Sequence, residues 1–200
     1  MMHPSNKFSA IWRTSQEVVV AYLDLLGTTA FYKKAAIEDQ RDRLIHLIEL
    51  VTCKVGGMSF PHDARPISEY LSCHIYADTA ILIERHSGSL PDVVNQFVGA
   101  MLEIQYDLLR LDPPVLSQAI IIRGPIFAIL GDQKPELLSQ VQVNVVGGKT
   151  LIDCHQRLKG LPMGVYIDSA LEREVGPDQI RFVPVAEQGG QDCEPGMFFV

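Results

Sequence analysis

The chain has 200 residues, of which 47% are hydrophobic and 20% are charged, which is enough apolar content to bury a substantial core. The density of isoleucine, valine and leucine excludes disorder over most of the chain. Its 17 basic and 24 acidic residues give a net charge of −7, which argues against a protein that binds nucleic acid through a broad basic surface.

No stretch of the sequence predicts a membrane span, because the longest apolar runs, 18–26 and 119–130, are short and contain Asp24 and Arg123. The first 16 residues lack the long apolar region of a signal peptide. The four cysteines lie far apart with no Cys-x-x-Cys pair, so neither a disulfide framework nor a zinc knuckle is indicated. We therefore expect a cytoplasmic protein with reduced thiols.

The first half of the sequence predicts a strand, a helical region and a β-hairpin. Residues 17–26 are rich in β-branched side chains and predict a buried strand. From 28 to 55 the apolar residues follow a helical period, and 56–66 predict a loop rich in glycine and proline. Two short strands over 68–76 and 79–84 then meet at a tip that carries a carboxylate.

The second half alternates helices and strands. Apolar positions repeat at helical spacing over 92–111, and a strand-like run follows over 117–130. Pro125 within that run indicates a sheet edge or a bulge near Gly124. The remaining predicted elements are a strand over 141–146, a helix over 149–158 and strands over 164–167 and 180–185.

This order of elements predicts a single domain over residues 1–200 that starts with a loose segment over 1–16. Two strands separated by a long helix favour a right-handed crossover, which places the helices on one face of a sheet. A ferredoxin-like α+β sandwich, with a mainly antiparallel sheet and helices on one face, fits the order with little strain. The alternation of helices and strands alone also fits a doubly wound fold.

Two aspartates stand at the ends of predicted strands, where a charge is costly unless it is paired or binds a cation. Asp24 lies at the carboxyl end of the first strand, before a helix start that offers backbone amides to an anion. Asp78 lies at the tip of the predicted hairpin. Each also has an ordinary structural explanation, because aspartate caps helices and suits turns.

In a sandwich of this order the first strand and the hairpin are neighbours, so we expect Asp24 and Asp78 to lie close together. Two adjacent carboxylates repel each other unless divalent cations neutralise their charge. Oxygen-only ligation suits Mg²⁺ or Mn²⁺, which typically keep bound waters and bind substrate phosphates. The pair therefore predicts a divalent-metal site.

Around these two aspartates the sequence resembles the class III nucleotidyl cyclases. Residues 22–27, Tyr-Leu-Asp-Leu-Leu-Gly, are similar to that family's first metal motif, and residues 76–79, Tyr-Ala-Asp-Thr, resemble its second. Residues 123–126, Arg-Gly-Pro-Ile, fall where the family has a strand with arginine and glycine. Residues 148–154 and 164–168 resemble the helix and the strand that follow, so the likeness covers about residues 18–170.

The departures from the family pattern favour pyrimidine substrates. Purine cyclases carry an asparagine and, four positions later, an arginine on the late helix. Here those positions hold Ile152 and Gln156, or Asp153 and Arg157 after a shift of one residue. The position that selects the purine holds His74. The compact chain and the motifs around Asp24 and Arg123 look closer to the bacterial Pycsar-type pyrimidine cyclases, which make cyclic UMP or cyclic CMP as an anti-phage signal.

This resemblance implies an enzyme that converts UTP, or less favourably CTP, to the 3′,5′-cyclic nucleotide and pyrophosphate with two Mg²⁺ or Mn²⁺ ions. It implies that Asp24 and Asp78 are catalytic and hold both ions, with the Leu25 carbonyl as a further metal ligand. The carboxylates and ions would position the triphosphate and offset its charge, as in other phosphoryl transfers.

Further residues are expected to contact the nucleotide. Arg123 interrupts an apolar strand, which suits either a catalytic contact with phosphate or the transition state, or an ion pair at a sheet edge. His74 suits a contact with the base or a hydrogen bond within its strand. The backbone amides that the resemblance assigns to the β- and γ-phosphates are those of Leu26, Gly27, Thr28 and Thr29.

Cyclases of this class act as head-to-tail dimers, so the resemblance implies a homodimer with active sites at the interface and a separate effector that responds to the cyclic nucleotide. Two other functions stay open. The loss of the asparagine and arginine pair favours a non-catalytic module that binds nucleotide or a partner protein. A divergent purine cyclase that makes cyclic AMP or cyclic GMP is disfavoured by His74 and by the altered helix. The sequence does not decide between UTP and CTP.

Overall fold

The computed structural model of the chain describes residues 16–58, 71–84, 89–130, 144–175, 183–184 and 197–199. The segment expected to be loose, 1–16, lies outside these residues except for Gln16, which begins a strand. No helix in the described ranges combines the length and hydropathy of a membrane span. In chain order the elements are β1 (Gln16–Leu25), α1 (Thr28–Tyr32), α2 (Ile37–Gly57), β2 (Leu71–Tyr76), β3 (Thr79–Glu84), α4 (Leu90–Leu109), β4 (Ser117–Leu130), β5 (Asn144–Gly147), α5 (Lys149–Leu158), β6 (Gly164–Asp168), α6 (Ser169–Val175), β7 (Val183–Pro184) and β8 (Met197–Phe199).

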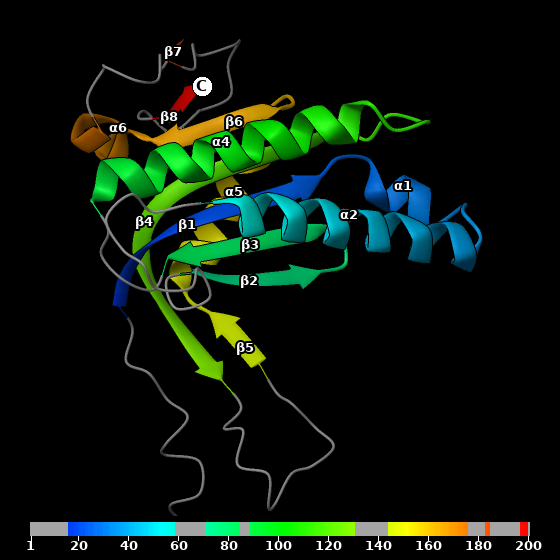
Figure 1. The fold of residues 1–200 in the computed structure, drawn as a ribbon, viewed down its shortest axis with the longest axis horizontal. Coiled ribbons are helices and arrows are strands. Elements are labelled where there is room, and N and C mark those ends of the chain that lie inside the picture. Colours follow the sequence, from blue (N-terminus) through cyan, green and yellow to red (C-terminus); the bar gives the residue numbers. More distant parts are fainter. Residues whose placement is uncertain are drawn as a thin grey trace, which may run out of the picture.

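Four neighbouring strands of a mainly antiparallel sheet lie in the order β2-β3-β1-β4, with β2 at the edge (Figure 1). β1 pairs antiparallel with both β3 and β4, and β6 extends the sheet as a parallel neighbour of β4. The crossover from β1 through α2 to β2 therefore encloses β3, and the crossover from β3 through α4 to β4 encloses β1. These interleaved units form the expected ferredoxin-like arrangement, with α2 and α4 on one face as right-handed crossovers require.

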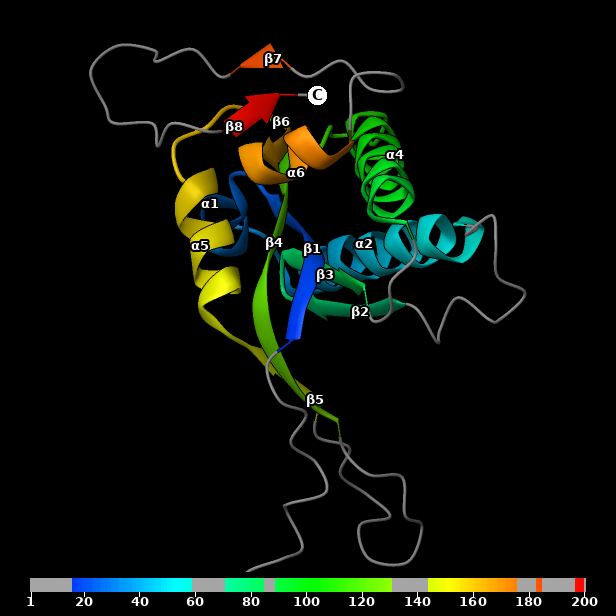
Figure 2. The same ribbon diagram turned by 90° about the vertical axis from the view of Figure 1, so that its left-hand side faces the viewer.

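The remaining short strands add to the edges of this sheet. β8 pairs antiparallel with β6, and β7 pairs with β8. β5 pairs with the far end of β4, where the two strands extend away from the rest of the sheet (Figure 2). The end of β1 that carries Asp24 lies away from that extension, because Asp24 pairs with Gln118 near the start of β4.

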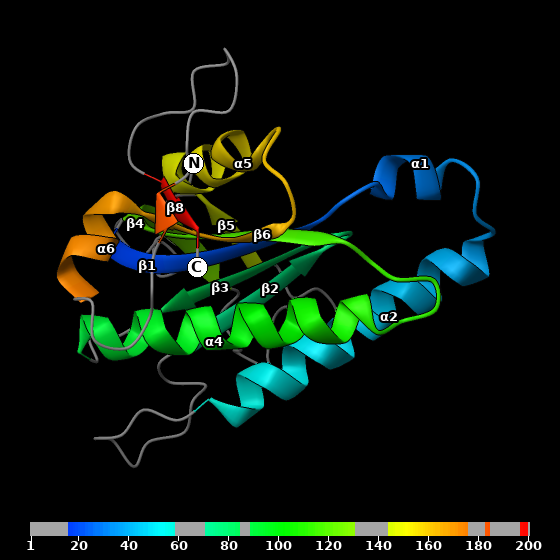
Figure 3. The same cartoon turned by 90° about the horizontal axis from the view of Figure 1, so that it is seen from above.

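Helices cover both faces of the sheet, as the view from above shows (Figure 3). α2, α4 and α6 pack on one face, which agrees with the expectation of helices on one face. α5 adds a helix on the opposite face, which the expectation did not include. The reason is its stripe of buried side chains at a spacing of four residues, Thr150, Cys154 and Leu158. Cys154 and Leu158 share the smaller hydrophobic cluster with Val20 and Ile120.

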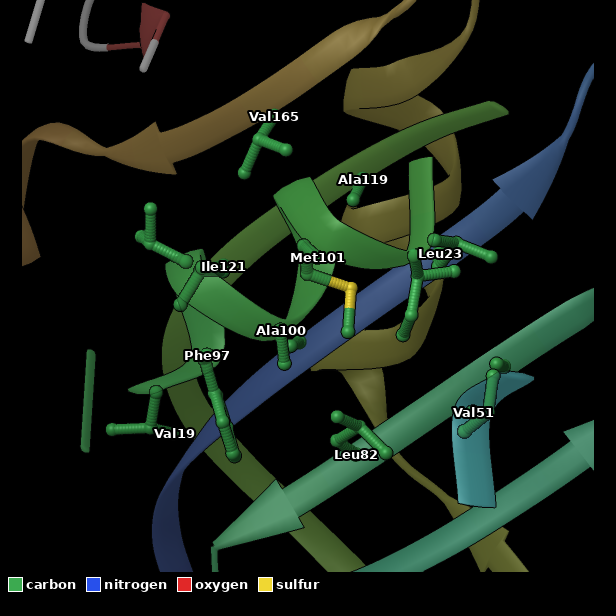
Figure 4. Packing of buried hydrophobic residues seen from close by; sticks show 14 of the residues in the cluster. Val19, Leu23, Val51, Leu82, Phe97, Ala100, Met101, Ala119, Ile121 and Val165 are labelled. Atoms are coloured by element: carbon green, nitrogen blue, oxygen red, sulfur yellow. The ribbon is translucent and has the colours of Figure 1, made fainter. Parts of the chain in front are cut away.

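The larger hydrophobic cluster lies between the sheet and the helices α2 and α4. Phe97 and Met101 of α4 are fully buried there and share the cluster with Val19, Leu82 and Ile121 from three strands (Figure 4). β1 is buried on both faces, because Val18 and Val20 on its other face join the smaller cluster under α5. A strand enclosed on both sides is a rigid support for the side chain of Asp24 at its end.

The helical region predicted over 28–55 is two helices in the structure, α1 and α2, and α2 continues to Gly57. The amide Nε2 of Gln40 donates to the carbonyl oxygens of Tyr32 and Ala35, at 3.1 and 3.0 Å, and so satisfies the end of α1 and the turn that follows. No glycine or proline marks this break, so the apolar period alone concealed it. Most of the loop predicted over 56–66 lies outside the described residues.

No bulge occurs at Gly124, because the register between β1 and β4 runs without offset from the pair Gln16 and Ile126 to the pair Leu25 and Ser117. Pro125 instead lies where β4 has passed the last residue that pairs with β6, Ile121. The missing amide hydrogen of proline is tolerated at such an edge. Of the two expectations for this proline, the edge is confirmed and the bulge is wrong.

Candidate active site

Asp24 and Asp78 meet where β1 ends beside the turn between β2 and β3. Asp24 pairs across the sheet with Thr79, the first residue of β3, and Asp78 is the residue just before it. The backbone amide of Leu25 donates to the carbonyl oxygen of Asp78 at 3.0 Å, which fixes the turn against the end of β1. The structure therefore confirms that these two carboxylates, far apart in the sequence, lie together.

Two threonine hydroxyls contact the carboxylates. Thr79 Oγ1 donates to Asp24 Oδ1 at 3.1 Å, and the hydroxyl of Thr28 donates to Asp78 Oδ2. The sequence interpretation assigned Thr28 only through its backbone amide and assigned Thr79 no role. The one sequence signal for Thr79 is its place directly after the hairpin tip, which sets it opposite Asp24 in an antiparallel register.

The environment of Asp24 disfavours its charged form. Burial raises the pKa of this carboxyl, the negative charge of Asp78 raises it further, and the hydrogen bond from Thr79 opposes both effects. The two carboxylates therefore repel each other in the metal-free protein, and a divalent cation would relieve that repulsion.

Asparagine at position 24 is expected to stabilise the metal-free protein at neutral pH. The fold raises the pKa of Asp24 above its ordinary 3.8, so the folded state binds the carboxyl proton more tightly than the unfolded state does. The free energy of unfolding therefore falls as the pH rises from 3.8 through the raised pKa of the folded state. Asparagine keeps an acceptor for Thr79 without the charge. The gain at pH 7 should be at most about 1 kcal/mol, because the side chain is partly exposed to screening solvent.

Denaturant unfolding of both proteins in EDTA, at pH 7 and at about pH 4, measures this effect. The advantage of Asp24→Asn should shrink at the lower pH, where a larger share of the wild-type carboxyl is protonated. An advantage of equal size at both pH values, or a loss of stability at pH 7, would contradict the proposed repulsion.

The turn that carries Asp78 contains a non-glycine residue in the left-handed region, Ala77, with φ of 51°. This conformation costs an alanine about 1–2 kcal/mol. Glycine adopts it freely but loses about 0.5–1 kcal/mol through the greater freedom of the unfolded chain. We therefore expect Ala77→Gly to raise the melting temperature by about 1–4 °C. Ala80→Gly, at a buried residue in β3, should lower the melting temperature. If both changes lowered the melting temperature equally, the backbone of Ala77 would not be strained.

The segment after Asp24 supplies fewer amides for phosphates than the sequence implied. The amide of Leu26 donates to the carbonyl oxygen of Leu116 at 2.8 Å, so its assignment to a phosphate is wrong. The amides of Gly27, Thr28 and Thr29 precede the first helical hydrogen bond of α1, from the Phe31 amide to the Gly27 carbonyl, so no helical carbonyl accepts from them. Gly27 has φ of 74°, which turns the chain from β1 into α1.

His74 lies on the same face of the sheet as Asp24, two strands away. It pairs with Ile81 of β3, which in turn pairs with Tyr22 of β1. Its ring stacks on that of Tyr76, with centroids 6.4 Å apart and an angle of 4° between the planes. Tyr76 is exposed over 46% of its surface. This face of β2 therefore presents a half-buried imidazole and an exposed phenol.

Arg123 does not join the two carboxylates within the chain, so its catalytic assignment stays a prediction that this geometry does not support. It pairs with Val19 at the other end of β1, and it projects to the face of α2 and α4, because its partner Val19 belongs to the cluster on that face. Its Nε lies 3.8 Å from Glu17 Oε2. Of the two alternatives for Arg123, the structure supports the ion pair of a sheet residue.

The late helix α5 carries the positions that the resemblance set against the asparagine and arginine of purine cyclases. Ile152 is 58% exposed, and Gln156 is also exposed, so both positions point away from the sheet. Arg157 instead forms an ion pair with Asp168 at the end of β6. Cys154 is fully buried, and burial raises the pKa of its thiol to about 12, so it belongs to the core.

The donors at the site fit a hard divalent cation. Two carboxylates, the Leu25 carbonyl and nearby hydroxyls supply oxygen only, and Mg²⁺ or Mn²⁺ completes its shell with water and substrate phosphates. In the described ranges no three histidine, cysteine or acidic side chains form a metal-binding cluster, so an all-protein metal cage is not part of this region.

A scan against protein-family models and a search of curated proteins both give no match. Solved structures do match. The guanylate cyclase domain of RhGC from Catenaria anguillulae, in complex with GTP, aligns with TM-score 0.63 and 12% identity over 94% of this chain and 97% of that one. The adenylyl cyclase CyaB from P. aeruginosa aligns with TM-score 0.60 and 11% identity over 94% of each chain.

The guanylyl cyclase Cya2 also matches, with TM-score 0.56 and 13% identity over 92% of this chain and 91% of that chain. Identities this low carry information about the fold alone, but each alignment covers most of both chains. The strand order of the sheet and the match to these cyclase structures lead to the same fold. This protein therefore has the α+β fold of the class III nucleotidyl cyclase domains.

Proposed function

We propose that the protein is a nucleotidyl cyclase that converts a pyrimidine nucleoside triphosphate, UTP in preference to CTP, to its 3′,5′-cyclic nucleotide and pyrophosphate. The observation that supports this most is the meeting of Asp24 and Asp78 beside the start of α1, within a fold shared with cyclase domains. Both carboxylates are half-buried, so they remain open to solvent and substrate.

Cyclisation joins the ribose 3′-oxygen to the α-phosphorus, breaks the bond between that phosphorus and the pyrophosphate oxygen, and passes the 3′-hydroxyl proton to solvent water. Asp24 and Asp78, with the Leu25 carbonyl, would hold two Mg²⁺ or Mn²⁺ ions, which would supply positive charge for the attacking and leaving oxygens. The amides of Gly27, Thr28 and Thr29 orient the β- and γ-phosphates. The chain thus acts by positioning the triphosphate and by offsetting its negative charge, as other phosphoryl-transfer proteins do.

The preference for pyrimidines is proposed from His74 and Tyr76. They occupy the face of β2 that continues from Asp24 and Thr79 across the sheet, where a base could lie flat against them or accept a hydrogen bond from the imidazole. A homodimer would bring a second chain over this face and over the exposed Ile152 of α5. The cyclic nucleotide would then activate a separate effector in anti-phage defence.

Two alternatives have a specific observation in their favour. The matching structures are named as guanylyl and adenylyl cyclases, and one contains GTP, which favours a purine cyclase. The asparagine and arginine pair of the purine-cyclase pattern is not intact on α5, where its positions hold Ile152 and Gln156 or, after a shift of one residue, Asp153 and Arg157. This favours a module that binds nucleotide without converting it.

The full chain should be incubated with ATP, GTP, CTP and UTP separately, in Mn²⁺ and in Mg²⁺, with mass detection of the products. We expect cyclic UMP, with less cyclic CMP, and neither from the double variant Asp24→Asn with Asp78→Asn. Cyclic AMP or cyclic GMP alone would select the purine cyclase. Thermal stabilisation by a nucleotide without any product would select the binding module, and no product with no stabilisation would remove all three functions.

A further inference from the structure

Each carboxylate of the site is held by a threonine from the other carboxylate's segment. Asp24 belongs to β1, and its Oδ1 accepts from Thr79 of β3 at 3.1 Å. Asp78 belongs to the hairpin turn, and its Oδ2 accepts from Thr28 at the start of α1. The two hydrogen bonds therefore cross between the β1–α1 junction and the hairpin, and they tie together the two segments whose charges repel.

The backbone holds both threonines in place. Thr79 faces Asp24 through the ladder of β1 and β3, and the hairpin is tied to β1 by the bond from the Leu25 amide to the Asp78 carbonyl, at 3.0 Å. Thr28 is only 6% exposed, and its hydroxyl also lies 3.4 Å from the Leu25 carbonyl oxygen. Of its two acceptors the carboxylate is the stronger, because a charged acceptor roughly doubles the strength of a hydrogen bond.

A hydroxyl on one carboxylate oxygen leaves other lone pairs for a cation, since an ionised carboxylate offers about four acceptor sites. Without these donors, two adjacent carboxylates would rotate apart into solvent, and a cation would have to restore their alignment on binding. Groups that orient metal ligands in this way typically change metal affinity about 10–100-fold when they are removed.

We infer that Thr28 and Thr79 are positioning residues, whose side-chain hydroxyls set the affinity of the Asp24–Asp78 site for divalent metal ions. This inference rests on the metal site of the proposed function, but not on the identity of the nucleotide or on turnover. It gives Thr28 a second role besides its backbone amide, through a side chain that the resemblance left unused.

The test measures Mn²⁺ binding to the full chain without nucleotide, from the electron paramagnetic resonance signal of free Mn²⁺. Thr28→Val and Thr79→Val remove the hydroxyl at nearly constant shape and should weaken binding about 10–100-fold. Thr28→Ser and Thr79→Ser keep the hydroxyl and should bind within about threefold of wild type. Thr52→Val, on the exposed surface of α2, is the matched control and should bind as wild type does.

Valine variants that bind Mn²⁺ as tightly as Thr52→Val would overturn the inference, as would serine variants that bind as weakly as the valine variants, since the methyl group would then be responsible. Thermal unfolding shows whether each variant is folded, and alanine replaces valine wherever valine prevents folding. Wild-type affinity in Asp24→Asn and Asp78→Asn would reject the metal site itself. Threonine-dependent Mn²⁺ binding without any cyclic product would reject the proposed function alone and leave the inference standing.

Discussion

Asparagine at position 24 or 78 is expected to lower the rate of cyclic nucleotide formation by at least about 1000-fold, which corresponds to about 4 kcal/mol of lost transition-state stabilisation. Either change removes one of the two negative charges that face a common space at the end of β1. The amide is nearly the same size, so the fold should persist. Neither carboxylate can replace the other, because each is oriented by a different threonine.

Initial rates with UTP over a range of Mn²⁺ concentrations measure this effect. Asp39→Asn, an exposed residue in the first turn of α2, is the matched control for a lost charge and should keep full activity. Saturating Mn²⁺ should not restore the two site variants. If either of them retained more than about a tenth of the wild-type rate, the carboxylate concerned would not be a catalytic ligand.

Alanine at position 124 is expected to destabilise the protein by about 1–3 kcal/mol, the usual cost of overpacking. A Cβ atom on Gly124 would lie 2.6 Å from Thr150 Oγ1 and 3.3 Å from its Cγ2. Thr150 cannot easily move, because it is 2% exposed and its hydroxyl donates to the Pro125 carbonyl at 2.7 Å. Gly124 therefore allows the first turn of α5 to pack directly on β4.

Two comparisons separate this contact from a general effect of alanine on thermal unfolding. Gly99→Ala on α4 should be neutral or stabilising by up to about 1 kcal/mol, because nothing lies within 4 Å of the added Cβ and alanine favours helices. In the background of Thr150→Ala, the cost of Gly124→Ala should fall by about 0.5–3 kcal/mol, since the clashing atoms are gone. Strictly additive losses would show that the strain lies elsewhere.

The sequence predicted the regular elements well where one physical pattern dominates locally. β4 and α5 have the predicted bounds of 117–130 and 149–158, because a long β-branched run and a short amphipathic helix bounded by glycine are local signals. The split between α1 and α2 was not predictable in this way. It depends on the side chain of Gln40 reaching back to two carbonyl oxygens, which leaves no trace in the apolar period.

Part of the candidate site was also predictable. A charge at the end of an apolar strand and a second at a hairpin tip, in an order that makes the two strands neighbours, indicated that Asp24 and Asp78 meet. Arg123 shows the limit of that reasoning. It too interrupts an apolar run, but β4 is buried on both faces, so the sequence pattern does not indicate to which face the arginine projects.

Apart from the split between α1 and α2, the amino-acid sequence alone indicated the main strands and helices among the described residues, and which two acidic residues stand at strand ends. The tertiary structure decided which side chains share a face and which hydroxyls reach the carboxylates, as Arg123, Thr28 and Thr79 show. The physical reason is that the period of apolar residues is a property of one segment, so it indicates the secondary structure of that segment without reference to its neighbours. A side-chain hydrogen bond between distant segments, in contrast, depends on strand register, which only the packed sheet establishes.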